Sequence, residues 1–289
     1  LMKKKFWSYI CSLLIFSVST SIISNAYENE KINYVALGDS IASGYIPGKV
    51  NLDKECYAYL LKSDIENCTG KSVSYENVAV SGQPTQSLMF QLQSLDLSNA
   101  DIITISIGSN DILIPFKNII STSLGCVSGN SIDEVANLFE QVQKNGLYAK
   151  YRLGRLMSIL SNVSNNDVIK ASTEDIKTNI DFIIKTIKEK NPSSKIIVTN
   201  FYNPYECIDM DYAKGFIKSF NEIKEELNEY LECHAKENGY YIADISDLGK
   251  EQGNLNINLR DENISFDPHP NKKGHHKIYE TIKRVGFNK

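Results

Sequence analysis

The chain has 289 residues, of which 42% are hydrophobic and 23% are charged, the composition of an ordinary globular protein. Its 16 tyrosines and 11 phenylalanines supply large apolar side chains for a core, which excludes a mainly disordered chain. The 16 glycines and 7 prolines are too few for a collagen-like or low-complexity sequence. The net charge of −4 disfavours a nucleic-acid partner, because such proteins present a basic surface.

The first 26 residues have the pattern of a secretory signal peptide. Three lysines at positions 3–5 precede a mostly apolar run over 6–23, and the tripeptide Ser24-Asn25-Ala26 fits the small-x-small rule for cleavage after Ala26. Serines and threonines interrupt the apolar run, which disfavours the alternative, an uncleaved membrane anchor. We therefore expect a signal peptide over 1–26 and a secreted, extracellular protein of bacterial type.

The remaining chain, 27–289, is expected to form a single domain. Cleavage after Ala26 would remove three lysines and no acidic residue, so the mature protein is more acidic than the whole chain. This acidity disfavours an anionic membrane surface as a partner. We also expect no stable membrane insertion after cleavage.

Five short apolar runs are predicted to be strands, and they alternate with helical patterns. The strand candidates are residues 34–37, 73–80, 101–107, 195–199 and 240–243. Continuous apolar residues, as opposed to alternating ones, are typical of strands buried on both faces. Apolar residues recur at helical spacing over 174–190, 212–237 and 271–284. The alternation of strands and helices predicts an α/β fold with a parallel sheet.

Residues 116–165 form a longer connection than one crossover between strands requires. The segment contains a stretch rich in serine and glycine over 121–130, and a helical pattern follows it. We expect a loop and helical insertion at about 116–165 that lies over the loop edge of the sheet.

Short polar motifs follow the first three predicted strands. Gly38-Asp39-Ser40 follows the first strand, Gly82 comes after the second, and Gly108-Ser109-Asn110-Asp111 follows the third. In a doubly wound sheet, ligands bind at the carboxyl ends of the strands. The motifs are therefore expected to lie together at one edge of the sheet.

The chain has four histidines, and a serine nucleophile needs a base within hydrogen-bond reach, which is usually a histidine. His234, His275 and His276 fall within helical patterns and are expected to be structural or solvated. His269 lies between two prolines, which restrict the loop and fix the direction of the imidazole. His269 is thus the candidate catalytic base.

Four blocks of the sequence resemble those of the GDSL, or SGNH, hydrolases in order and spacing. They are Gly38-Asp39-Ser40, Gly82, Gly108-Ser109-Asn110-Asp111 and Asp267-Pro268-His269-Pro270. The resemblance implies a flavodoxin-like three-layer α/β/α sandwich with a mostly parallel five-stranded sheet of order 2-1-3-4-5. It also implies an esterase, lipase or other acyl hydrolase that needs no cofactor or metal, and the sequence has no HExxH or similar metal-ligand spacing.

The resemblance assigns a role to each block. Ser40 is expected to be the nucleophile and His269 the general base. The backbone N–H groups of Ser40 and Gly82 and the side-chain amide of Asn110 would form the oxyanion hole, since neutral, preorganised donors stabilise a tetrahedral intermediate. Gly82 and Asn110 also fit simple turn residues, which is the alternative interpretation. Asp39 is expected to cap or brace its loop.

Two further aspartates, Asp111 and Asp267, are expected to position the groups of the site. Asp111 is expected to hydrogen-bond nearby backbone and to help aim Asn110. The family's aspartate that orients the histidine lies three residues before it, but Phe266 occupies that position here and Asp267 lies only two residues before His269. We favour Asp267 as the orienting acid. The alternative is a backbone carbonyl in that role and a serine–histidine dyad.

The predicted function is that of a secreted serine esterase or lipase acting on a small-molecule or lipid ester. A carbohydrate acetylesterase with the same site is the alternative, and the apolar insertion favours an acyl chain over an acetyl group. A non-catalytic binding protein on the same fold is disfavoured because Ser40, Gly82, Asn110 and His269 are all present. A flavin carrier is disfavoured because Asp39 would repel a phosphate. The sequence leaves the oligomeric state open.

Five of the six cysteines lie after residue 26, and export makes disulfide bonds possible. An odd number leaves at least one thiol unpaired within the chain. We expect a local bridge between Cys56 and Cys68. A second bridge is expected between Cys126 and Cys207, whose loops follow neighbouring strands, and a free thiol at Cys233.

Overall fold

The computed structural model describes residues 31–45, 54–251, 253–259 and 264–287. The expected signal peptide, 1–26, lies outside the described residues. Five strands form one sheet, in which every neighbouring pair is parallel and the order is β2-β1-β3-β4-β5. The strands are β1 (Ile32–Gly38), β2 (Val73–Asn77), β3 (Ile102–Ser106), β4 (Lys195–Thr199) and β5 (Tyr241–Ala243). The expected fold class and strand order are confirmed.

The burial of the strands explains why the sequence shows continuous apolar runs. All five residues of β3 are buried, as are the last five of β1 and the last four of β4. The edge strands β2 and β5 have exposed residues. Helices therefore cover both faces of the central strands, as expected for a parallel sheet.

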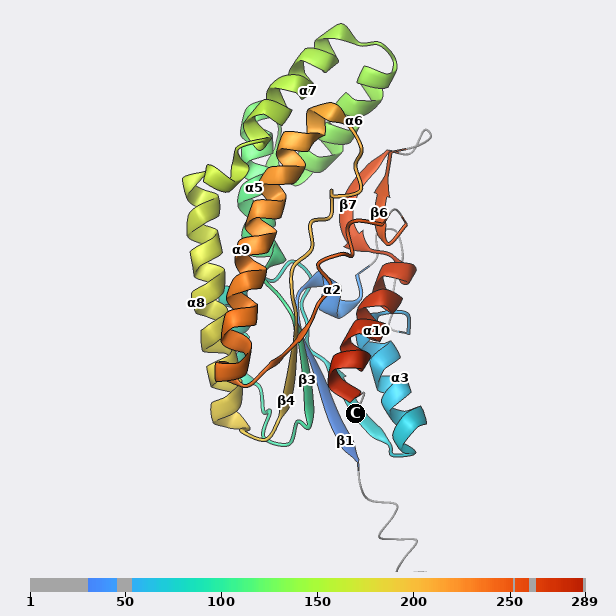
Figure 1. Cartoon of the computed structure of the whole chain (residues 1–289), viewed down its shortest axis with the longest axis vertical. Helices are drawn as coiled ribbons and strands as arrows, with labels where there is room; N and C mark the ends of the chain where they lie inside the picture. Colours follow the sequence, from blue (N-terminus) through green and yellow to red (C-terminus); the bar gives the residue numbers. More distant parts are fainter. Residues whose placement is uncertain (1–30, 46–53, 252, 260–263, 288–289) are drawn as a thin grey trace, which may run out of the picture.

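The helices form two layers, one on each side of the sheet (Figure 1). The helices α3 (Tyr57–Thr69) and α10 (Lys272–Phe287) pack together on one face. Their buried residues share one core cluster with side chains of the sheet. The opposite layer is made of α4 (Thr85–Ser94), α5 (Ser109–Leu124), α8 (Asp167–Lys190) and α9 (Lys214–Asn238), which contribute to the larger core cluster. The short η3 (Asp211–Ala213) precedes α9.

The segment 116–165, expected to be an insertion, is largely helical. It contains the second half of α5, then η1 (Ser128–Asn130), α6 (Ser131–Gln143), α7 (Leu147–Leu160) and η2 (Val163–Asn165). Figure 1 shows α6 and α7 beyond the carboxyl edge of the sheet, at one end of the long axis of the molecule.

A two-stranded antiparallel sheet, which the sequence patterns did not predict, follows the main sheet. Its strands are β6 (Leu255–Asn258) and β7 (Ser265–Pro270). Phe266 of β7 packs edge-on against Phe139 of α6, with ring centroids 5.6 Å apart. This contact fastens the second sheet to the helices of segment 116–165.

Within the described ranges, no single helix is long and apolar enough to cross a membrane. One pair of successive helical stretches, Ser109–Leu124 and Ser128–Gln143, passes the test of length and composition together, with a bend of 97° between them.

The expected disulfide bonds are wrong: no disulfide joins the five cysteines of the described ranges. Cys56 and Cys68 lie at opposite ends of α3, and twelve residues of helix separate them by about 18 Å, beyond the ~7 Å that a disulfide allows. The expected Cys126–Cys207 bridge required Cys126 to lie near the carboxyl edge of the sheet, but α5 runs for 16 residues and carries Cys126 roughly 24 Å beyond that edge. Cys233 is exposed on α9.

Candidate active site

The turn after β1 presents Ser40 at the carboxyl edge of the sheet. Gly38 has φ +132°, and a side chain there would place its Cβ 1.9 Å from the Ser106 carbonyl oxygen of the neighbouring strand β3. Only glycine fits this close approach. Ser40 then begins the short helix α2 (Ser40–Ser43). Asp39 caps this helix, because its Oδ1 accepts a hydrogen bond from the Ile41 N–H at 3.0 Å, and its expected capping role is confirmed.

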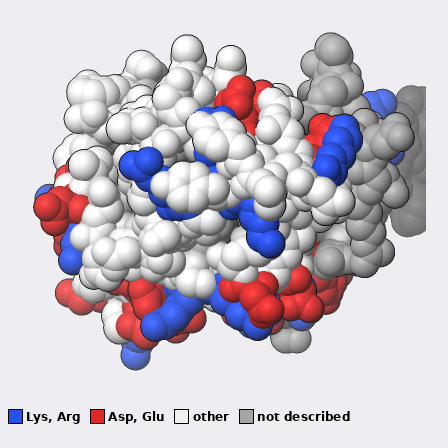
Figure 2. All heavy atoms as spheres, turned by 90° about the horizontal axis from the view of Figure 1, so that it is seen from above, with Lys and Arg blue, Asp and Glu red and all other residues white. Residues whose placement is uncertain are grey.

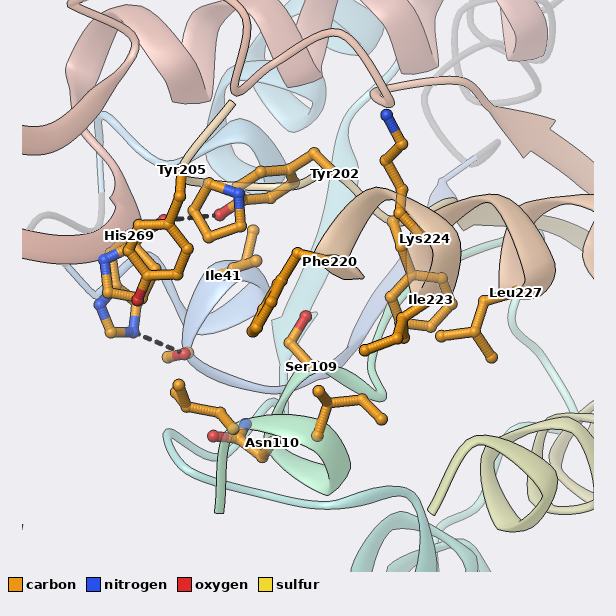
Figure 3. Close-up of a pocket in the computed structure, with 16 residues that line it drawn as sticks. Ile41, Ser109, Asn110, Tyr202, Tyr205, Phe220, Ile223, Lys224, Leu227 and His269 are labelled. Carbon is orange, nitrogen blue, oxygen red and sulfur yellow. Dashed lines mark hydrogen bonds between the residues drawn. The ribbon is translucent and has the colours of Figure 1, made fainter. Parts of the chain in front are cut away.

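Ser40 lies within hydrogen-bond distance of His269, although 229 residues separate the two in the sequence. The distance from Ser40 Oγ to His269 Nε2 is 3.0 Å, as Figure 3 shows with a dashed line. On the other side of the imidazole, His269 Nδ1 lies 2.6 Å from Asp267 Oδ1. The structure therefore brings Ser40, His269 and Asp267 together in a continuous chain of contacts.

The geometry of β7 explains how an aspartate two residues before the histidine reaches its ring. In a strand, side chains of residues i and i+2 lie on the same side, so Asp267 and His269 are neighbours on one side of β7. The same Asp267 Oδ1 also accepts the backbone N–H of His269 at 2.9 Å. Phe266 points to the other side, where it packs against Phe139. A residue at the position of Phe266 therefore faces away from the imidazole.

Two tyrosines that sequence reasoning missed lie around His269. The hydroxyl of Tyr202, in the loop after β4, donates to the Pro268 carbonyl oxygen at 2.8 Å. Burial raises the pKa of Tyr202 well above its ordinary value, so this hydroxyl stays protonated and remains a donor. The ring of Tyr45 meets the imidazole of His269 edge-on, with centroids 4.8 Å apart. No local sequence pattern marks either residue, because both contacts are made between distant loops.

Asn110 and Gly82 lie on two neighbouring loops at the same edge of the sheet. Asn110, the second residue of α5, is buried, and its Nδ2 donates to the Gln83 carbonyl oxygen at 3.2 Å. Gly82, with φ +81°, directly precedes Gln83. Its conformation favours glycine, although no atom would obstruct a Cβ there. Asn110 lines a pocket together with Ser40 and His269, and its bond to Gln83 connects it to the loop that carries Gly82.

Several N–H groups at this edge are available to a ligand. An amide nitrogen carries two hydrogens, so one N–H of Asn110 remains after the bond to Gln83. Across the described ranges of the chain, no acceptor takes the backbone N–H of Ser40 or that of Gly82. These three groups are the donors that the resemblance to the GDSL hydrolases assigns to an oxyanion hole.

Asp111 connects three helices behind Asn110. Its carboxylate accepts the backbone N–H of Thr85 at 2.9 Å and the Thr85 hydroxyl at 2.5 Å. Thr85 begins α4, and its Oγ1 accepts in turn from Asn179 Nδ2 of α8 at 2.9 Å. The expected bond of Asp111 to nearby backbone is confirmed. The sequence did not identify Thr85 and Asn179, because this network joins three separate helices.

Burial shifts the pKa values of two groups near the nucleophile. Asp39 is fully buried, and desolvation raises its pKa to about 7. His275 of α10 is also buried and stacks on Tyr57 at 6.3 Å, and desolvation lowers its pKa to about 4. Neither nitrogen of His275 has a hydrogen-bond partner within the described part of the chain. His275 is thus a neutral core residue, in agreement with its expected structural role.

The pocket beside Ser40 extends between α5 and α9 and is mostly apolar. In Figure 3, His269 and Leu227 lie at opposite ends of the pocket. The apolar side chains that line the pocket include Ile112, Leu113, Phe220 and Ile223. The stem of Lys224 also lines the pocket, and its ammonium group is 3.3 Å from Glu206 Oε2. The apolar residues at helical spacing in α9 thus supply part of the wall of the pocket.

A family model and solved structures agree with this architecture. The model of the GDSL-like lipase/acylhydrolase family matches residues 36–277. No curated protein matches the sequence. A lipase from a goat rumen metagenome is 18% identical in sequence, with a TM-score of 0.56. The match covers 89% of this chain and 99% of the lipase chain. An extracellular lipase from Streptomyces rimosus is 16% identical, with a TM-score of 0.58, and the match covers 88% of this chain and 99% of that lipase.

A third similar structure is phospholipase A1 from Streptomyces albidoflavus NA297, with 19% identity, a TM-score of 0.56, and 88% of this chain and 99% of its own covered. At these identities the likeness shows the shared fold. The family match extends from β1 into α10 and includes all four sequence blocks. The chain therefore belongs to the GDSL-like lipase/acylhydrolase family and is a carboxylic ester hydrolase.

Proposed function

We propose that the protein is a secreted serine hydrolase that cleaves esters of hydrophobic acids through an acyl-enzyme on Ser40. The observation that carries this proposal is the contact of 3.0 Å between Ser40 Oγ and His269 Nε2. A serine hydroxyl is a weak nucleophile unless a neighbouring base removes its proton. His269 is placed to do so at the moment of attack.

The acylation step uses the three residues in sequence. Ser40 Oγ attacks the carbonyl carbon of the ester while its proton moves to His269 Nε2. The resulting imidazolium is stabilised by Asp267, whose Oδ1 lies 2.6 Å from Nδ1, and the same contact holds the tautomer in which Nε2 is free to accept. His269 then gives the proton to the departing alkoxide, which leaves as the alcohol.

The negative charge of the tetrahedral intermediate would be held by neutral donors. We assign this role to the backbone N–H groups of Ser40 and Gly82 and to Asn110 Nδ2. The hydrogen bond from Asn110 to the Gln83 carbonyl at 3.2 Å fixes the amide before substrate binds. Preorganised donors of this kind need no reorganisation as charge develops on the oxygen.

Deacylation uses the same groups with water as the nucleophile. His269 Nε2 takes a proton from the water, the hydroxide attacks the acyl carbon, and Ser40 recovers its proton as the acid leaves.

The apolar pocket favours an acyl chain as the bound part of the substrate. Side chains such as Phe220, Ile223 and Leu227 extend the pocket away from Ser40, and they can bury a hydrocarbon chain but offer no hydrogen bonds to a sugar. An acetyl group would leave most of this pocket unfilled. The same observation disfavours a carbohydrate acetylesterase.

Export is proposed on the sequence of residues 1–26. The lysines, the apolar run and the Ser24-Asn25-Ala26 tripeptide together resemble a cleavable signal. N-terminal sequencing of the protein from the culture medium tests this proposal, and the expected first residue is Tyr27. A protein retained in cells with residues 1–26 attached would contradict it.

The proposed activity is tested with a panel of p-nitrophenyl esters from acetate to palmitate, beside sugar acetates and lysophospholipids. We expect kcat/KM to rise from acetate to longer acyl chains, and sugar acetates to be poor substrates. A preference for sugar acetates would support the carbohydrate acetylesterase. Hydrolysis of none of these esters would contradict the proposed function.

A further inference from the structure

The start of α7 carries three exposed apolar side chains at one end of the molecule. Leu147, Tyr148 and Tyr151 are 85%, 75% and 67% exposed. Residues three and four apart on a helix are neighbours, so Tyr151 lies beside both Leu147 and Tyr148. Single exposed apolar residues are common on proteins, but a contiguous group is typical of an interaction surface. We call residues 144–155 the α7 tip.

Positive charge accompanies these apolar side chains. The chain contains 35 acidic and 31 basic residues, yet 141–166 contains no acidic residue. The basic residues of this stretch are Lys144, which forms an ion pair with Glu140 of α6, and Lys150, Arg152 and Arg155. Figure 2 views the molecule from this end and shows basic groups within a mostly uncharged surface, with most acidic groups towards the margins. The α7 tip is thus apolar and cationic on an otherwise acidic protein.

Contacts within the chain hold the α7 tip in its conformation without a partner. Arg152 Nη2 donates to the Leu124 carbonyl oxygen at 2.8 Å, which ties α7 to the end of α5. The guanidinium of Arg152 also lies 6.0 Å from the centre of the Tyr148 ring, close enough for a cation–π contact. Lys150 and Arg155 are exposed, and neither forms an ion pair with a residue of the described ranges. Their charges are available to an anionic partner.

We propose that the α7 tip docks on the surface of an anionic lipid bilayer. Leu147 and the two tyrosine rings would enter the boundary between headgroups and acyl chains, where aromatic side chains with a polar end are favoured. Lys150 and Arg155 would lie at the level of the lipid phosphates, to which cationic side chains are attracted. The acidic remainder of the protein is repelled by such a surface, so the α7 tip is the side that approaches it.

The shape of the α7 tip favours a flat bilayer over a protein partner. The tip lies at one end of the long axis (Figure 1), so it reaches a plane before the rest of the molecule does. Three side chains of roughly 200 Å² each, all partly covered, present less than the ~800 Å² per partner of a stable protein interface. The net charge of the whole chain disfavours an anionic membrane, but the local charge at the tip is of the opposite sign.

The proposal is tested by sedimentation with vesicles of phosphatidylcholine alone and with vesicles that also contain phosphatidylglycerol. The full chain with Ser40→Ala is used, so that binding is measured without hydrolysis and independently of the proposed activity. The measured quantity is the ratio of binding to anionic over neutral vesicles. It is compared between the parent and its variants, which share the lysines at 3–5 and the apolar residues 6–23, so the contribution of this segment is the same in each. We expect a ratio well above one that falls as salt is added.

Two double variants and a control separate the contributions. Lys150→Glu/Arg155→Glu is expected to reduce the ratio at least tenfold, since each cation contributes roughly a fivefold effect near an anionic surface. Leu147→Ser/Tyr151→Ser is expected to weaken binding to anionic vesicles several-fold. The salt dependence of the remaining binding should be unchanged. The control, Lys185→Glu/Lys218→Glu, changes two exposed lysines on α8 and α9 and is expected to bind as the parent does.

An unchanged ratio in Lys150→Glu/Arg155→Glu, with the fold intact by circular dichroism, would overturn the proposal. A dimer of the parent in solution that disappears in Leu147→Ser/Tyr151→Ser would also overturn it, because the tip would then serve a second copy of the chain. Equal losses in the control variant would show that net charge, not the α7 tip, governs binding.

Discussion

Asp267 contacts His269 twice through one oxygen atom: Oδ1 accepts the His269 backbone N–H at 2.9 Å and lies 2.6 Å from Nδ1 of its ring. The backbone bond fixes the carboxylate relative to the strand, and the fixed carboxylate then orients the ring. A spacing of two residues suffices because both side chains lie on the same side of β7. This relationship favours a triad over a dyad.

We predict that Asp267→Asn lowers kcat by about 10³–10⁴-fold, because the amide favours the wrong imidazole tautomer. Steady-state kinetics with a p-nitrophenyl ester measure the effect. Asp209→Asn, at an exposed position of the loop after β4, serves as the control and is expected to retain full activity. A loss of less than about tenfold would point to a dyad oriented by a backbone carbonyl.

Asn110→Ala is expected to lower kcat by roughly 10²–10³-fold with little change in KM, the effect of removing one donor from an oxyanion hole. The amide is buried and already aimed by its bond to Gln83, so no other side chain replaces it. Asn118→Ala, at an exposed position later on α5, is the matched control. A near-normal kcat for Asn110→Ala would mean that Asn110 is only a turn residue.

Leu227 lies at the end of the pocket away from His269, so a larger side chain there should shorten the acyl chain that fits. Leu227→Phe is expected to lower kcat/KM for p-nitrophenyl octanoate about tenfold or more, since a methylene group in an apolar pocket changes kcat/KM by roughly 10–200-fold. The rate with acetate should be unchanged. Leu231→Phe, one turn later in the core, controls for overpacking, and equal effects of both variants would argue against this pocket as the acyl site.

His275 is expected to make the fold sensitive to acid. The folded protein takes up a proton on His275 only near pH 4, because burial lowers its pKa to about 4, whereas the unfolded chain does so near pH 6.5. Neutral His275 therefore makes its whole contribution to the free energy of unfolding above about pH 6.5, and this contribution is lost as the pH falls towards 4. The loss is on the order of 3 kcal/mol.

His275→Phe should remove this pH dependence while keeping a ring against Tyr57. Burial raises the pKa of Asp39 to about 7, so protonation of Asp39 stabilises the fold as the pH falls and partly hides the effect of His275. The free energy of unfolding is therefore measured with urea at pH 7 and pH 4.5 for the variant and the wild type, and the two changes are compared. His276→Phe, at the exposed neighbouring position, is the control. An equal acid sensitivity in His275→Phe and wild type would refute this role of His275.

Much of the fold was predictable because burial on both faces leaves a continuous apolar signal. Strand β4 has the bounds expected from the sequence, and β3 differs by one residue at each end. The sheet order came from the family resemblance. The second sheet was missed because β7 contains Pro268 and Pro270, which are atypical of strands and confine them to edges.

The site was predictable in its four blocks but not in its surroundings. Ser40, Asn110 and His269 follow recognisable motifs, whereas Thr85, Tyr202 and the pocket residues of α9 act through contacts between distant segments. The disulfide predictions failed because helices separate the paired residues. The helix α3 holds Cys56 and Cys68 at its opposite ends, and α5 continues past Ser121 to Leu124, which carries Cys126 away from the sheet edge.

The central claim, that Ser40 is the nucleophile, is tested most directly by covalent labelling with a fluorophosphonate probe, followed by peptide mass spectrometry. We predict one label per chain on Ser40 in the wild type, the same label in the control Ser109→Ala, and neither label nor ester turnover in Ser40→Ala. Labelling of a different residue, or turnover retained by Ser40→Ala, would contradict the assignment.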